Sequence, residues 1–103
     1  MLSKKYRLTR KQVGYVYQKG KRFSLGEIGV KYFPNRLEHA RFAINIPAKV
    51  YKKAVDRNHL RRIIYDEVGK LPILGYDFII SLYKSVDEEN IRSKTKEIFN
   101  RIR

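Results

Sequence analysis

The chain contains no cysteine, and this absence removes several kinds of chemistry at once. Disulfide cross-links, thiolate nucleophiles and zinc sites built on cysteine are all excluded. Acidic residues are also scarce, with 10 Asp and Glu against 24 Lys and Arg. The lack of cysteine fits a reducing cytoplasm, which is where we expect the protein to be found.

Long apolar runs are missing as well. No stretch approaches the ~20 apolar residues of a membrane span, and the basic N-terminus is not followed by the apolar core of a secretory signal. We therefore expect a soluble, intracellular protein. The 103 residues suffice for one compact domain, and a hydrophobic content of 43% is enough to form its core.

Positive charge dominates the composition, with a formal net charge of +14 at pH 7. Such an excess repels the compact state and is offset most simply by a polyanion. RNA or DNA is the first candidate, and an anionic membrane surface is the second. A membrane-surface protein would need a basic helix whose apolar face is free to insert, whereas Leu60, Ile63 and Ile64 are better used in a core.

The first regular element that the sequence predicts is a helix over residues 10–19. Thr9 and Gln12 form a possible capping box at its start, and Gly20 is placed to end it. Residues 1–7 are basic and without period, so we expect a mobile arm there.

Alternation with period two then predicts strands. Residues 23–33 change phase at Gly26–Glu27, which indicates a bulge or bend within one extended segment. A second strand is expected over 41–46. A third is expected over 76–83, where nearly continuous apolar residues predict a strand buried on both faces.

Two further helices complete the predicted domain. A basic helix is expected over about 54–69, and Ser85 or Asp87 is placed to cap a last helix. The order helix, strand, strand, helix, strand, helix contains no internal repeat and no linker. The sequence therefore predicts a single α+β domain over residues 1–103.

The most informative segment is the basic helix, which contains Arg57-Asn58-His59-Leu60-Arg61-Arg62. Six Lys or Arg lie between Lys49 and Arg62, and Asp56 is the one acid among them. At 100° per residue the arginine side chains fall on one side of the helix, and Leu60, Ile63 and Ile64 fall on another. The aliphatic side can therefore pack in a core while the guanidinium groups bind phosphates. Exposed helices also carry arginine for solubility alone, but the lysines leading into this one favour RNA or DNA. Asn58 suits a phosphate contact and a structural hydrogen bond equally well.

Tyrosine is abundant, with 8 residues, and several of them lie in basic segments. Stacking of a base on an aromatic ring contributes about 1–3 kcal/mol whatever the base, which suits a single-stranded ligand. Tyrosine is also common at the half-buried rim of a core, and for any single tyrosine this is the simpler interpretation. For the set of Tyr15, Tyr17, Tyr32 and Tyr83 we expect at least one stacking contact.

The sequence offers little for intrinsic catalysis. His39 and His59 lie far apart, and neither has a carboxylate at metal-ligand spacing. The acids Asp87, Glu88 and Glu89 suit the N-terminus of a helix, and no glycine-rich phosphate loop is present. We predict no catalytic residue and no protein-bound metal, so any chemistry would be supplied by another component.

Two blocks of sequence resemble the bacterial ribonuclease P protein component, Arg41 to Val50 and Ala54 to Ile64. Within the second block, Arg57-Asn58 and Arg61-Arg62 match the family's arginine–asparagine signature. The resemblance covers nearly the whole chain. It implies a sandwich of helices on a mixed or antiparallel sheet, similar to the second domain of ribosomal protein S5, with a left-handed βαβ crossover.

The resemblance also implies a function. In this family a catalytic RNA removes the 5′ leader of precursor tRNA with bound Mg2+, and the protein binds the leader and the RNA subunit. We therefore expect the protein subunit of an endoribonuclease, with Mg2+ held chiefly by RNA. Its partners would be ribonuclease P RNA and precursor tRNA, with no membrane and no obligate protein partner. The alternative is a small ribosomal or ribosome-associated RNA-binding protein without a catalytic role, which would not stimulate cleavage.

Carried over by position, the candidate residues divide between the two RNAs. The group expected at the RNA subunit is Lys49, Lys52, Lys53, Arg57, Asn58, Arg61 and Arg62. The group expected at the leader is Val13, Tyr17, Tyr32, Arg41 and Tyr65. The chain departs from the family pattern at several positions, where a residue usual in the family is replaced. Val13 stands where the family usually has phenylalanine, Ala48 where it has lysine, and His59, Tyr65 and Tyr83 where it has arginine. Each replacement removes an aromatic ring or a positive charge that could contact RNA.

Overall fold

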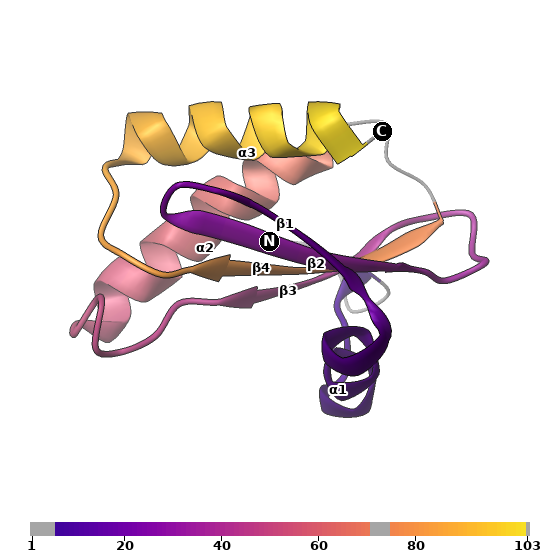
Figure 1. Ribbon diagram of the computed structural model, residues 1–103. Helices are drawn as coiled ribbons and strands as arrows, with labels where there is room; N and C mark the ends of the chain where they lie inside the picture. Colours follow the sequence, from indigo (N-terminus) through magenta and orange to yellow (C-terminus); the bar gives the residue numbers. More distant parts are fainter. Residues whose placement is uncertain (1–5, 71–74, 103) are drawn as a thin grey trace.

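The computed structural model describes residues 6–70 and 75–102. Three helices and four strands make up the described chain (Figure 1). They are α1 (Arg10–Lys19), β1 (Lys21–Leu25), β2 (Ile28–Pro34), β3 (Arg41–Asn45), α2 (Ala54–Gly69), β4 (Tyr76–Leu82) and α3 (Glu88–Ile102). The predicted α+β class is confirmed, with one strand more than the sequence indicated.

The strands form one mixed sheet in the order β1-β2-β4-β3. β1, β2 and β4 pair antiparallel, whereas β3 and β4 run parallel and are joined through α2. β4 is therefore an interior strand, and its residues Asp77–Ile80 and Leu82 are buried. Burial on both faces explains the nearly continuous apolar sequence, as predicted.

One face of the sheet is covered by α2 and α3, which lie together above it in Figure 1. Alternate strand residues point to this side and form the core with the apolar stripes of the two helices. The strands contribute Ile28, Val30, Phe42, Phe78, Ile80 and Leu82, and the helices Leu60, Ile63, Ile64, Val68, Ile91, Ile98 and Phe99. The aliphatic face predicted for the basic helix is thereby confirmed.

The segment 23–33 is a hairpin and not a single bent strand. β1 and β2 pair out to Leu25 and Ile28, which leaves Gly26 and Glu27 as a two-residue loop. Gly26 has a φ of 61°, a conformation that such loops require and that L side chains rarely adopt. The phase change in the sequence marks a reversal of the chain, so the prediction of a bulge or bend was wrong.

α1 packs on the opposite face of the sheet, below it in Figure 1. The predicted capping box is present, with the Gln12 N–H donating to the Thr9 hydroxyl at 3.3 Å and the Thr9 N–H to the Gln12 side chain at 2.8 Å. Gly20 ends the helix because of close approach and not because of a positive φ. A Cβ there would lie 2.6 and 2.9 Å from the carbonyl oxygens of Val16 and Tyr32.

The N-terminal arm falls partly outside the described residues, which begin at Tyr6. Arg7 forms a parallel bridge with Phe42 of β3, and the Leu8 N–H donates to the Phe42 carbonyl at 2.9 Å. Tyr6 packs edge-on against His39, with ring centroids 5.2 Å apart. The end of the expected mobile arm is therefore held on the sheet. In the described part of the chain, no helix is long and apolar enough to cross a membrane.

Candidate nucleic-acid interface

α2 divides its side chains between core and solvent as helical periodicity requires. Leu60 and Ile64 are buried, Arg57 and Arg61 lie half-buried beside them, and Arg62 is exposed. Asn58 and the lysines that lead into the helix, Lys49, Lys52 and Lys53, are exposed as well. The residues assigned to the RNA subunit thus lie on one helix and the loop before it. We call this set the α2 basic surface.

The arginines of the α2 basic surface differ in what they already bind. The Arg57 Nη1 donates to the carbonyl oxygens of Tyr51 and the following residue, at 2.8 and 3.0 Å, and so fastens the loop to the helix. The Arg61 Nη1 donates to the Asn58 Oδ1 at 3.1 Å. Arg62 has no hydrogen-bond or ion-pair partner within the described chain. Its whole guanidinium is available to a ligand.

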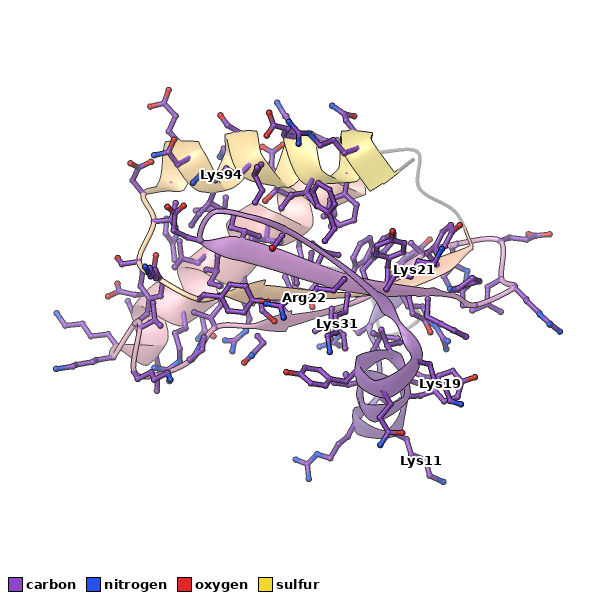
Figure 2. The ribbon with its side chains drawn as sticks, in the orientation of Figure 1. Lys11, Lys19, Lys21, Arg22, Lys31 and Lys94 are labelled. Carbon is purple, nitrogen blue, oxygen red and sulfur yellow. The ribbon has the colours of Figure 1, made fainter. Side chains whose placement is uncertain are left out.

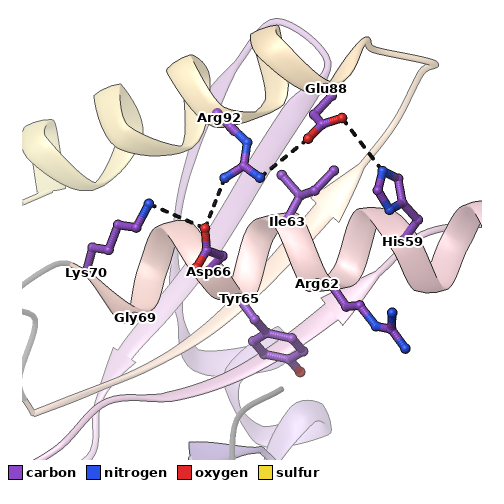
Figure 3. A pocket seen from close by; sticks show the side chains of 9 residues that line it. All are labelled: His59, Arg62, Ile63, Tyr65, Asp66, Gly69, Lys70, Glu88 and Arg92. Carbon is purple, nitrogen blue, oxygen red and sulfur yellow. Dashed lines mark hydrogen bonds and ion pairs between the residues drawn. The ribbon is translucent and has the colours of Figure 1, made fainter.

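The side of α2 that faces α3 is rich in acids (Figure 3). Arg92 of α3 donates to Asp66 at 3.1 Å and to Glu67 at 2.8 Å, and Glu88 lies between Arg92 and His59. Most of these residues line a hollow of about 630 Å³. The hydrogen bond from Arg92 holds the pKa of Asp66 below its ordinary value. The acids on this side are thus already paired within the protein, whereas Arg62, which lines the same hollow, has no such partner among the described residues.

The sheet face that carries α1 shows two rows of side chains crossing all four strands. The pairing register aligns Arg22, Lys31, Ile79 and Ala43 in one row and Ser24, Gly29, Ser81 and Asn45 in the next. Because the second row has short side chains, the surface is hollow there. A cleft of about 120 Å³ opens at this point and is lined by Tyr17, Arg22, Gly29, Lys31, Asn45, Ile79, Ser81 and Tyr83. We call it the sheet cleft.

A cation lies against each aromatic ring of the sheet cleft. The Lys31 Nζ lies 3.7 Å from the centroid of the Tyr17 ring and donates to the Tyr17 carbonyl at 3.0 Å. The Arg22 Cζ lies 5.7 Å from the centroid of the Tyr83 ring. Figure 2 shows Arg22 and Lys31 on the side of the sheet where α1 lies. With Tyr17 59% and Tyr83 44% exposed, both rings can stack on unpaired bases.

Tyr32, expected beside Tyr17, lies on the other face of the sheet. Its ring packs 6.2 Å from that of Phe78 in the core and 5.9 Å from that of Tyr76, measured between centroids. Since successive strand residues point to opposite faces, the position of β2 in the sheet cleft belongs to Lys31. Tyr17 and Tyr32 therefore do not line the same cleft: Tyr32 lines a separate hollow with Lys21 and Tyr76, and its contact with the leader stays a prediction.

Arg41 and Tyr65, also expected at the leader, lie outside the sheet cleft. The Arg41 Nε and Nη2 donate to the two carboxylate oxygens of Asp77 at 2.8 and 2.7 Å, in a separate groove of about 640 Å³. Tyr65 belongs to α2 and is half-buried against the core, where burial raises the pKa of its phenol. Val13, by contrast, precedes Tyr17 by one helical turn on the same side of α1. Of the five residues, Tyr17 alone is among those that line the sheet cleft.

Sequence reasoning missed most of the sheet cleft. Lys31 could have been found from strand parity once the hairpin was recognised, because the turn sets which residues share a face. No local pattern links Gly29 with Tyr83, which are brought together by the pairing of β2 with β4.

Comparison with known proteins connects this geometry to a family. The ribonuclease P family model matches residues 2–103. The chain belongs to the ribonuclease P protein family. The ribonuclease P protein component of Photorhabdus laumondii is 31% identical over 93 residues, which cover 88% of this chain and 78% of the relative. That of Histophilus somni is 35% identical over 81 residues, covering 77% and 68%.

Solved ribonuclease P proteins share the fold. The Staphylococcus aureus protein superimposes with a TM-score of 0.84 at 24% identity, covering 95% of each chain. The Thermotoga maritima protein gives 0.83 at 23% identity, covering 94% of this chain and 97% of that one. The expected sandwich is confirmed, and the similarity to the second domain of ribosomal protein S5 is consistent with it. A superposition this complete also means that the β3–α2–β4 crossover has the same handedness in this protein as in those two structures.

Membership of this family defines the general role. The protein acts in tRNA 5′ maturation as the protein subunit of ribonuclease P. It is thus part of an endoribonuclease complex and a partner of ribonuclease P RNA.

Proposed function

We propose that this ribonuclease P protein positions precursor tRNA and leaves cleavage to its RNA subunit. The sheet cleft receives the single-stranded 5′ leader, and the α2 basic surface contacts ribonuclease P RNA. The observation that carries the proposal is the sheet cleft, with two exposed tyrosine rings, a cation against each, and a floor of short side chains.

A cleft of this kind suits a ligand without a fixed sequence. An aromatic ring stacks on any base, and Lys31 and Arg22 attract phosphates whatever bases they join. A leader is unpaired, so its bases are free to leave each other and stack on protein. Contacts of this type would let one protein serve many precursors.

The α2 basic surface suits a structured RNA. Arg57 is anchored to the preceding loop and Arg61 to Asn58, so part of the surface is formed before any ligand binds. Folded RNA is recognised largely through its shape and its phosphates, for which a rigid array of cations is well fitted. Preorganisation also reduces the entropy lost on binding.

Magnesium enters the proposal as a cofactor of the RNA. Over residues 6–70 and 75–102, no three His, Asp or Glu gather in a group that could hold a metal ion. Phosphate oxygens of the RNA subunit and substrate are suitable ligands for Mg2+. The lysines and arginines of the protein reduce the repulsion between the two RNAs, so less Mg2+ is needed to bring them together. A cytoplasmic location and the absence of an obligate protein partner belong to the same proposal.

The first test is a precursor-tRNA cleavage assay at low Mg2+, using a bacterial ribonuclease P RNA with and without the protein. We expect cleavage at the mature 5′ end to be stimulated, and precursor tRNA to bind more tightly than mature tRNA. Lys31→Ala should reduce this preference. Arg101→Ala, an exposed arginine of α3, is the matched control. RNA binding without stimulation would refute the proposed positioning role, and equal binding of precursor and mature tRNA would refute the leader site.

A further inference from the structure

Tyr83 is held in the sheet cleft although it is the first residue beyond β4. Its backbone N–H donates to the Glu27 carbonyl at 2.8 Å, which continues the alignment of the strand by one residue. Tyr83 follows Ser81 by two positions and therefore points to the same face of the sheet. Tyr83 is 44% exposed and lines the cleft together with Tyr17 of α1. The Tyr83 side chain thus points into the sheet cleft and remains accessible to a ligand.

Gly29 makes room for the Tyr83 ring. A Cβ built on Gly29 would lie 2.6 Å from the Tyr83 Cε2 and 2.8 Å from its Cζ, closer than real side chains approach. The hydroxyl, Cε2 and Cζ of the ring therefore rest directly on the backbone of β2 at Gly29, while the side chain as a whole stays 44% exposed. Gly29 lies in a paired strand, where glycine weakens the sheet unless close approach requires it. Close approach of this ring is such a requirement.

Two cations lie side by side between the two rings. Lys31 contacts Tyr17, Arg22 contacts Tyr83, and Arg22 and Lys31 are direct partners across the β1–β2 ladder. Residues so paired have their Cβ atoms about 5 Å apart, and like charges in that position repel. A phosphate bound between them would remove the repulsion. The order ring, cation, cation, ring matches a strand of nucleic acid, which has one phosphate between two successive bases.

We propose that Tyr83, seated on Gly29, is a second stacking platform, so that the sheet cleft binds two successive unpaired nucleotides of the leader. One base stacks on Tyr17 and the next on Tyr83, and the phosphate that joins them lies between Lys31 and Arg22. This inference rests on the proposed leader site and adds to it a nucleotide register. It assigns to Tyr83 a contact that replaces the charge of the arginine usual in the family.

The test uses the assembled holoenzyme and precursor tRNAs that carry 2-aminopurine at single leader positions. Stacking on tyrosine quenches this base, so each position reports its own environment. In the unsubstituted holoenzyme two neighbouring positions should be quenched. Tyr17→Ala should restore fluorescence at one of them and Tyr83→Ala at the other, each with a loss of leader affinity of about five- to a hundredfold. Tyr83→Phe keeps the ring and should keep the quench.

Two further variants separate stacking from folding. Tyr15→Ala removes an exposed tyrosine of α1 outside the sheet cleft and should leave both signals unchanged. Gly29→Ala should displace the Tyr83 ring and reproduce the effect of Tyr83→Ala at the same leader position. In the Tyr83→Ala background no ring remains to be displaced, so Gly29→Ala should then have no further effect on leader binding.

The outcomes distinguish the inference from the function on which it rests. If precursor and mature tRNA bind equally and no leader position is quenched, both are overturned. If the leader binds but Tyr83→Ala leaves every quench and the affinity unchanged, the second platform alone is overturned. Loss of the same single quench in both tyrosine variants would also overturn it, because the two rings would then serve one base.

Discussion

The arginines of α2 differ in whether their guanidinium nitrogens already bind the protein, and we therefore expect different effects of their substitution on RNA binding and on stability. Arg62 has no partner within the described chain, so Arg62→Ala should weaken binding of the RNA subunit about tenfold without changing stability. Arg57 also holds two loop carbonyls, so Arg57→Ala should weaken binding and lower the free energy of unfolding by about 1 kcal/mol. Filter binding and urea unfolding measure the two effects. Equal unfolding curves for both variants would contradict this division.

Lys31 and Tyr32 are neighbours in sequence, but we expect substitution of one to affect leader binding and substitution of the other to affect stability. Tyr32 packs on the core face, so Tyr32→Ala should cost about 2 kcal/mol of stability, below the usual cost of a buried aromatic because the ring is half-buried. Its effect on leader affinity should be small. Lys31→Met should instead weaken leader binding and leave the unfolding midpoint nearly unchanged. The pair is measured by thermal unfolding and by binding of a leader oligonucleotide, and a reversed pattern would restore the sequence-based assignment of Tyr32.

At the scale of elements, α3 is held on α2 by the Arg92 network, and this predicts a dependence on pH. The hydrogen bond from Arg92 lowers the folded pKa of Asp66, and Lys94 does the same for Glu27 on the hairpin. A carboxyl with a lowered folded pKa stabilises the protein above its unfolded pKa, and the contribution is lost as pH falls through the lower, folded value. Melting temperatures should therefore fall mainly below about pH 4.

The variant Arg92→Met tests the origin of this acid sensitivity. It should melt at a lower temperature than the unsubstituted protein at pH 7, because Asp66 and the buried Glu67 lose their shared partner. The difference between the two proteins should shrink as the pH approaches 3. Arg101→Met, which removes only an i,i+4 pair on the surface of α3, serves as the control. A difference that stays constant with pH would mean that Arg92 acts through packing and not through charge.

Element type was predictable from sequence where local chemistry decides it. The Thr9–Gln12 box, the Asp87 cap and the boundaries of α2 all depend on residues within a few positions of each other. Strand faces were less predictable, because they depend on where the chain turns. Reading Gly26–Glu27 as a bulge missed the hairpin that pairs β1 with β2, and Tyr32, placed at the leader by its position in the family, packs on the core face. The Arg41–Asp77 pair joins two strands and leaves no local trace.

The whole molecule separates its two proposed RNA surfaces into different layers. The α2 basic surface lies in the helical layer, and the sheet cleft lies on the face that carries α1 (Figure 1). The net charge of +14 raises the affinity of both surfaces for any RNA. Specificity must then come from the local arrangement of cations and rings, because total charge does not distinguish one RNA from another.

This separation predicts independent salt dependences. Binding of an unpaired leader oligonucleotide should weaken with salt, with log K falling by about 0.7 per phosphate contact for each unit of log salt concentration. Lys31→Ala should reduce that slope by about one contact and leave the slope for ribonuclease P RNA unchanged, and Arg62→Ala should do the reverse. In the double variant the two losses should add, because the sites share no partner. If either single substitution changed both slopes, the two RNAs would be sharing one surface, and the assignment of separate layers to leader and RNA subunit would fail.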